Sequence, residues 1–105
     1  MKNFTVQNFV ESFVGFTDSK IYLRVRFGTK LFQISGRPEK FIVFCNSVNG
    51  YTLRIARAEI EMISQRPDGI GLSIRLSDYT LPSLNTEFID ALLEDCEKFN
   101  LSVAG

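Results

Sequence analysis

The first residues that could do chemistry are Glu59 and Glu61, two carboxylates separated by one residue in a stretch with a strand-like pattern. In a strand, such residues project from the same face about 7 Å apart, which is close to the separation of carboxylate pairs that hydrolyse glycosidic bonds. Those enzymes enclose the pair in a cleft built from long loops, whereas the loops expected in this chain have about two to four residues. We therefore interpret the pair as a solvated strand face and predict that the chain is not an enzyme.

Several groups that commonly carry out catalysis are missing. The chain contains no histidine, which excludes Ser-His-Asp and Cys-His nucleophile systems and the usual imidazole metal ligands. Cys45 and Cys96 lie far apart in two apolar stretches, so we expect two buried thiols rather than a disulfide or a zinc site. Gly69 and Gly71 lack the third glycine of a nucleotide-binding loop. We therefore expect no catalytic residue, no metal and no cofactor.

A basic surface is the strongest candidate for binding. Tyr22, Arg24 and Arg26 alternate along residues 20–27, so a strand there would place them on one outer face. Arginine beside an exposed aromatic ring on an open sheet can grip a phosphate backbone and stack bases. The same charges would also protect an edge hairpin from aggregation. A formal net charge of zero disfavours a dedicated nucleic-acid binder.

Charge is divided unevenly along the chain. Residues 1–57 contain nine Lys and Arg against three Asp and Glu, and residues 58–105 contain three against nine. Unless the fold interleaves the two halves, this asymmetry predicts one basic and one acidic surface. The acidic surface would lie on the C-terminal helix, on Glu87, Asp90, Glu94, Asp95 and Glu97.

The leading hypothesis is a small non-catalytic binding protein of the inhibitor, immunity or adaptor type, which docks on another protein through a charged sheet or helix surface. The predicted partner-binding residues are Tyr22, Arg24, Arg26, Arg54, Arg57, Glu87, Asp90 and Glu94. The alternative is a nucleic-acid or anionic-ligand binding domain that uses the Arg/Tyr hairpin face, with Lys30, Arg54 and Arg57 as further contacts. Complementary surfaces also predict a homo-oligomer, in which the basic hairpin of one copy meets the acidic helix of another.

The elements that must position these residues begin with a helix over residues 6–14. Apolar residues there follow the spacing of one helix face, with Thr5 as the N-cap and Gly15 at the end. Residues 20–27 then alternate as a strand, and Gly28-Thr29 predicts a type II′ turn. That turn sets the register of a hairpin, in which Phe27 pairs with Lys30, Val25 with Phe32 and Leu23 with Ile34.

The middle of the chain predicts a second hairpin. Residues 41–45 are continuously apolar, which is typical of a central strand covered on both faces. Asn49-Gly50 favours a type I′ turn, after which residues 51–57 would pair back. The predicted partners are Phe44 with Ile55 and Cys45 with Arg54.

The remaining pattern predicts strands and a helix. Residues 57–65 fit either a helix or a strand, and we favour a strand because Pro67-Asp68-Gly69 forms a turn before the alternating residues 70–76. Ser77-Asp78 predicts another turn, followed by a short edge strand over residues 79–81. The C-terminal helix has Ser83 or Asn85 as its N-cap and ends at Asn100. One of its faces carries Leu84, Phe88, Leu92, Cys96 and Phe99.

Together these elements predict one α+β domain over residues 1–105: an antiparallel sheet of five or six strands in hairpins, a short N-terminal helix and an amphipathic C-terminal helix. No apolar run approaches the length of about 20 residues that a membrane helix needs. The first residues lack the apolar segment of a signal peptide. We therefore expect a cytoplasmic protein without a membrane partner.

Overall fold

The computed structural model describes residues 4–14, 20–76 and 86–104, and its sheet is built around the hairpin of β2 (Lys20–Phe27) and β3 (Lys30–Gly36). The register is the predicted one, with Phe27 opposite Lys30, Val25 opposite Phe32 and Leu23 opposite Ile34. Gly28 has a φ of 60°, which glycine adopts without strain at the first central position of a type II′ turn. The turn and the apolar alternation therefore specify the same pairing.

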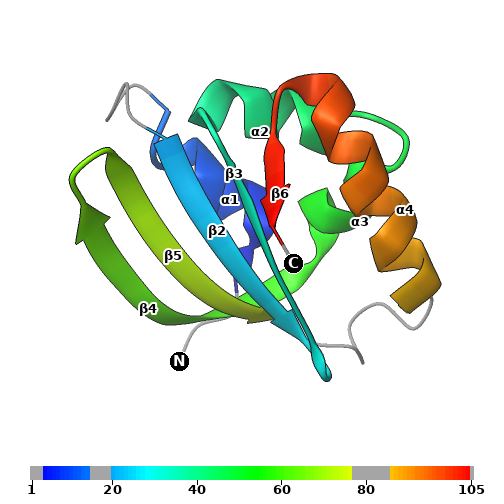
Figure 1. Cartoon of the computed structure of the whole chain (residues 1–105), viewed down its shortest axis with the longest axis horizontal. Coiled ribbons are helices and arrows are strands. Elements are labelled where there is room, and N and C mark those ends of the chain that lie inside the picture. Colours follow the sequence, from blue (N-terminus) through cyan, green and yellow to red (C-terminus); the bar gives the residue numbers. More distant parts are fainter. Residues whose placement is uncertain (1–3, 15–19, 77–85, 105) are drawn as a thin grey trace.

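Within the described residues, six strands form one sheet in the order β1-β4-β5-β2-β3-β6 (Figure 1). The other strands are β1 (Phe4–Thr5), β4 (Arg57–Arg66), β5 (Gly69–Leu76) and β6 (Ser102–Ala104). Neighbouring strands are antiparallel except β2 and β5, which are parallel. The α+β fold class and the strand over residues 57–65 are therefore confirmed, whereas the parallel pair was not predicted.

The helices in the described ranges are α1 (Val6–Glu11), α2 (Pro38–Cys45), α3 (Gly50–Ile55) and α4 (Thr86–Cys96). Thr5 caps α1, because its Oγ1 accepts a hydrogen bond from the Asn8 amide at 3.2 Å. After α4 the chain continues into a 3-10 turn, η2 (Glu97–Phe99), and Asn100 ends it in the left-handed conformation at a φ of 62°. Both of these predicted helix boundaries are confirmed. Across the described ranges, no helix has the length and apolar character needed to cross a membrane.

The N-terminal helix is shorter than predicted, because residues 12–14 form a turn after α1. Some predicted features lie outside the described residues, namely Gly15 as the helix end, the turn and edge strand over residues 77–81, the caps Ser83 and Asn85, and Leu84. The side chains of Glu87 and Phe88 lie outside them as well.

The second predicted hairpin is wrong, because residues 41–45 belong to α2 and residues 50–55 form α3. The strand partners predicted for it, Phe44 with Ile55 and Cys45 with Arg54, are therefore wrong as well. Asn49-Gly50 forms no type I′ turn, since Gly50 is the first residue of α3.

The apolar run of α2 is buried as one face of a helix. Pro38 occupies the first helical turn, where its fixed φ suits the helix and its missing amide proton costs nothing. Phe41, Phe44 and Cys45 are buried, while Val43 between them is 55% exposed. A strand covered on both sides would bury Val43 too, so the burial follows the helical period of 3.6 residues.

Gly50 is required by a close approach between α2 and α3. A Cβ at this position would lie 1.7 Å from the carbonyl oxygen of Phe44. Ser47 reinforces the connection, because its Oγ donates to the Phe44 carbonyl at 2.6 Å and accepts from the Gly50 amide at 3.0 Å. The glycine that resembles a hairpin signal thus serves a helix–helix contact.

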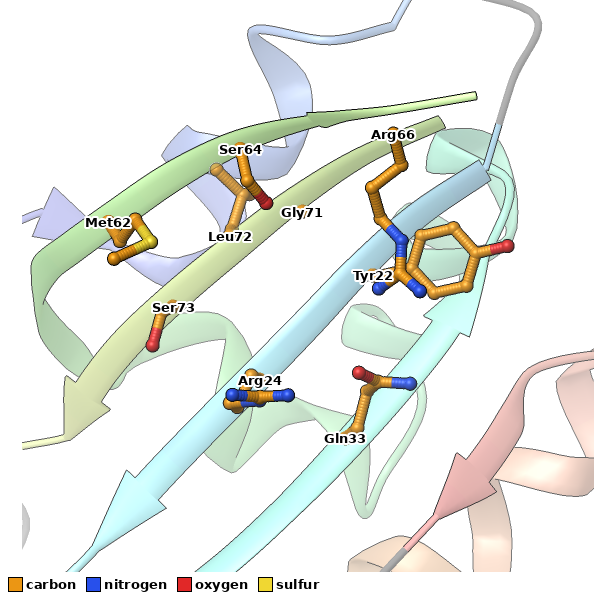
Figure 2. A pocket seen from close by; sticks show the side chains of 9 residues that line it. All are labelled: Tyr22, Arg24, Gln33, Met62, Ser64, Arg66, Gly71, Leu72 and Ser73. Atoms are coloured by element: carbon orange, nitrogen blue, oxygen red, sulfur yellow. The ribbon is translucent and has the colours of Figure 1, made fainter. Parts of the chain in front are cut away.

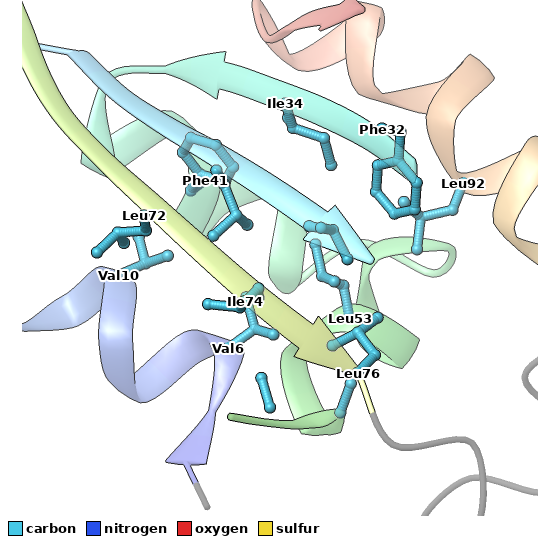
Figure 3. Packing of buried hydrophobic residues seen from close by; sticks show 14 of the residues in the cluster. Val6, Val10, Phe32, Ile34, Phe41, Leu53, Leu72, Ile74, Leu76 and Leu92 are labelled. Carbon is cyan, nitrogen blue, oxygen red and sulfur yellow. The ribbon is translucent and has the colours of Figure 1, made fainter. Parts of the chain in front are cut away.

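The hydrophobic core lies between the sheet and the helices (Figure 3). Val6 and Val10 of α1 pack under β5, and Phe41 of α2 packs under β2 (Figure 3). Leu92 and Cys96 of α4 are buried as predicted, together with Ile89, which was not on the predicted face. All of these helices contribute to a single cluster on one side of the sheet, so the other side of its central strands is left without a helical cover (Figure 1).

Replacing Gly50 by alanine tests the role of this glycine. We expect Gly50→Ala to lower the free energy of unfolding by about 3 kcal/mol, because the new methyl group overlaps the Phe44 carbonyl. Asn49→Ala, the matched control, should change it by less than about 1 kcal/mol. Urea unfolding of both variants measures the difference, and equal losses would contradict the helix–helix contact.

The two thiols supply a pH-dependent prediction. Cys45 and Cys96 are buried and free, and burial raises the pKa of each from 9.0 to about 12. Between these pH values an unfolded chain releases thiol protons that the folded chain retains, so the free energy of unfolding falls as pH rises above about 9. We expect the urea midpoint of unfolding to fall between about pH 8 and about pH 10, and to fall less in a Cys45→Ala, Cys96→Ala variant than in the parent chain. The same loss in both proteins would count against buried thiols.

Candidate functional site

The uncovered side of the sheet carries the candidate site. We call it the open face, and strand register defines its outward residues as Glu59, Met62, Ser64 and Arg66 on β4, Gly71, Ser73 and Arg75 on β5, Lys20, Tyr22, Arg24 and Arg26 on β2, and Leu31, Gln33 and Ser35 on β3. Along β2 these residues alternate with fully buried ones. The predicted alternation of this strand is therefore confirmed.

A hollow of about 170 Å³ lies in the middle of the open face (Figure 2). Its floor is β5, where Gly71 has no side chain and Ser73 has a small one. Met62 and Ser64 of β4 line one side, and Arg24 of β2 lines the other (Figure 2). A Cβ at Gly71 would lie 2.5 Å from Ser64 Oγ, so the missing side chain leaves the space between the two rows open.

One end of the hollow is closed by a polar cluster. The guanidinium of Arg66 lies over the ring of Tyr22, with its Cζ 4.0 Å from the ring centroid (Figure 2). The Tyr22 hydroxyl donates a short hydrogen bond to Asp68. That hydrogen bond, with the negative charge of the acceptor, raises the pKa of Tyr22, and it lowers the pKa of Asp68. The cluster therefore holds the ring and the guanidinium in a fixed stack.

Arg24 is the cation at the centre of the open face, and no carboxylate of the described residues pairs with it. It is exposed and makes no hydrogen bond or ion pair with the part of the chain that the structure describes. It also stands between two hollows, because a second one of about 300 Å³ is lined by Arg24, Leu31, Gln33 and Ala104. A segment that crossed the strands through both hollows would meet this guanidinium midway.

Two other arginines of the open face are neutralised by carboxylates, whereas Arg66 is held by its stack on Tyr22. Arg26 forms an ion pair with Glu61 at 2.5 Å, and Arg75 forms one with Glu59. Glu61 lies at a β-bulge in β4, between the register positions of Ile60 and Met62. The two glutamates predicted as a solvated strand face thus each hold an arginine of a neighbouring strand.

The remaining predicted basic residues lie elsewhere. Arg54 is in the last turn of α3, on the helical side of the sheet, where its Cζ lies 5.6 Å from the ring centroid of Tyr51. Arg57 is the first residue of β4 and pairs with Thr5 of β1. The structure therefore does not bring Arg54 and Arg57 together with Tyr22 and Arg24.

The acidic residues of the C-terminal helix are partly engaged within the chain. Asp90 forms an ion pair with Lys30 at 2.6 Å, which ties α4 to the start of β3. Asp95 pairs with Lys98, while Glu94 and Glu97 are exposed. Because Lys30 and Arg26 come from the basic half and their partners from the acidic half, the fold interleaves the two halves instead of separating them.

Sequence reasoning did not predict the side of the hollow that β4 and β5 form. Met62, Ser64, Arg66 and Ser73 reach Arg24 only because β5 pairs with β2 in parallel. Parallel strands are not joined by a tight turn, so no local sequence signal predicts that β5 lies beside β2. The alternation of β4 and β5 did indicate which of their residues point outward.

Comparison of the chain with protein-family models, with curated proteins and with solved structures finds no match. Among the described residues, no group of three or more His, Cys, Asp and Glu side chains is placed to hold a metal ion. Function must therefore be inferred from the side chains of the open face.

The polar cluster gives a direct test of this geometry. We expect Asp68→Asn to lower the pKa of Tyr22 toward the ordinary value of 10.0, because the variant removes the charge that favours the protonated phenol. Glu59→Gln, a carboxylate of the same face without a contact to Tyr22, should leave it unchanged. Titration of ring-labelled tyrosine by NMR measures the Tyr22 pKa in both variants. A Tyr22 pKa that is the same in Asp68→Asn and in the parent chain would show that the hydrogen bond is not formed in solution.

Proposed function

We propose that this chain is a small non-catalytic binding domain that docks on another protein through its open face. The observation that carries the proposal is the pair of hollows around Arg24, an exposed arginine without a partner among the described residues. Exposed apolar groups flank it, since Met62 is 63% and Leu31 is 55% exposed. An arginine between apolar side chains is a frequent centre of protein interfaces.

The charges of the open face favour a protein over a nucleic acid. Nucleic-acid binding depends on uncompensated positive charge, whereas Arg26 and Arg75 are paired with glutamates. Stacking of bases needs free ring faces, and Arg66 already covers one face of Tyr22. Arg24, with Lys20 and Arg66 on the same face, favours the anionic-ligand alternative, so the test below includes nucleic acid as an outcome.

The form of the hollows supports binding rather than catalysis. The titratable side chains that line the first hollow are Tyr22, Arg24 and Arg66, and they include no base beside a nucleophile. The pKa of Tyr22 is raised, which makes its phenolate less accessible at neutral pH. Docking on a protein as an inhibitor, immunity or adaptor protein needs no such group, and a cytoplasmic setting would keep both buried thiols reduced.

Capture of partners from a lysate of the source cells tests the proposal when surface variants are compared. Arg24→Glu reverses the free charge, and Ser73→Arg fills the first hollow. We expect each variant to reduce recovery of a specific protein at least about tenfold, because loss of a central arginine contact typically costs that much affinity. Val48→Arg, which adds the same charge at a 91% exposed site on the connection between α2 and α3, should retain it.

The controls separate the alternatives. All three variants must keep the thermal midpoint of the parent chain, so that loss of binding is not loss of folding. Capture that nuclease treatment abolishes would assign the face to nucleic acid. Capture of the same protein by the parent chain, Arg24→Glu and Ser73→Arg alike would remove the open face as the docking site.

A further inference from the structure

The outer edge of β4 is only partly covered by another strand. β1 pairs with β4 at Arg57 and Ala58, and the described residues provide no strand beside the rest of that edge. The bulge at Glu61 interrupts β4, after which Met62 to Arg66 run in regular register with β5. This regular stretch of β4, Met62–Arg66, therefore presents backbone amide and carbonyl groups on an open edge.

The stretch Met62–Arg66 also exposes apolar side chains on both faces of the sheet. Met62 points to the open face and is 63% exposed, and Ile63 points to the helical side and is 57% exposed. Edges that stay unpaired are usually guarded by lysine, proline or inward-pointing charge. Between Met62 and Gln65 the chain has no charge and no proline, and the bulge at Glu61 and the pair Arg66-Pro67 lie only at the ends of this stretch.

We propose that Met62–Arg66 pairs antiparallel with the same stretch of a second copy of this chain, about a two-fold axis that passes beside Ser64. In this register Ser64 faces Ser64 of the second copy, Met62 faces Arg66 and Ile63 faces Gln65. Opposed residues must point to the same side of a continuous sheet, and each of these pairs does so. The axis at Ser64 uses the whole regular stretch and brings the smallest side chain to the point of closest contact.

Charge along β4 favours a second copy in this direction. Glu61 directly precedes the stretch Met62–Arg66 and Arg66 ends it, whereas Arg57 and Glu59 lie farther back along β4. Antiparallel pairing places Glu61 of one copy near Arg66 of the other, whereas in-register parallel pairing would align like charges. No charged residue of the stretch faces a like charge. Because five residues bury less than the roughly 1,600 Å² of a standard interface, the dimer is weak.

Cross-linking through one new cysteine tests the register. The native cysteines are both buried, so Ser64→Cys introduces the accessible thiol. Residues directly opposite in an antiparallel pair have Cα atoms about 4.5–5.5 Å apart, within the range of a disulfide. We expect mild oxidation to convert most of Ser64→Cys to a covalent dimer, while Val48→Cys, 91% exposed on the α2–α3 connection, stays largely monomeric. Equal rates of cross-linking in the two variants would overturn the proposal.

Sedimentation equilibrium of the chain without the new cysteine provides a second measurement. The average mass should rise with concentration from 11.9 kDa toward twice that value. Ile63→Lys should hold it at 11.9 kDa because it guards the edge with charge, and Val48→Lys should behave like the parent chain. A parent chain that stays at 11.9 kDa up to millimolar concentration would refute the dimer. Ile63 lies on the helical side, so Ile63→Lys leaves Arg24 and its hollows intact, and failure of the dimer is distinguishable from failure of docking.

Discussion

The structure depends on β2, a strand that is buried on one face and paired along both edges. Ile21, Leu23 and Val25 of β2 are fully buried against the helices, and its backbone bonds to β3 on one side and to β5 on the other. Because side chains alternate along a strand, burial of these three residues leaves Tyr22, Arg24 and Arg26 no position except the outer face. The same constraint that builds the core thus places the candidate site at the centre of the sheet.

Local chemistry predicted those parts of the fold that neighbouring residues determine. Gly28 set the β2–β3 register, and Pro67-Asp68 joined β4 to β5 in the order expected. The apolar run over residues 41–45 was misassigned because length and hydrophobicity alone do not separate a buried strand from a short buried helix. Pro38, which favours the first turn of a helix, is the local signal that separates the two. The β2–β5 pair could not be predicted locally, because parallel partners are joined by long connections, and the hollow around Arg24 depends on that pair.

The uneven division of charge along the sequence becomes a set of contacts inside the molecule. Arg26–Glu61 and Lys30–Asp90 each join the basic half to the acidic half. Exposed pairs of this kind contribute little stability, typically about 0–1 kcal/mol. On the proposed docking surface they remove competing charges and leave Arg24 as the unpaired guanidinium at the centre, since Arg66 is stacked on Tyr22. A partner of the proposed docking site would then be selected by this central charge and the shape around it, rather than by a broad electrostatic field.

The bulge at Glu61 connects the two proposed surfaces. The Glu61 carboxylate at this bulge pairs with Arg26 on the open face. From Met62 onward β4 is in regular register with β5. The hollow and the proposed pairing edge therefore both begin at Met62. A two-fold axis perpendicular to the sheet keeps both open faces on the same side of the dimer. Two copies of the Arg24 hollow would then face one partner together. A partner with two matching sites would bind one hollow first and then the second hollow of the same dimer, as an intramolecular step. Its apparent affinity for the dimer would therefore exceed its affinity for a single hollow.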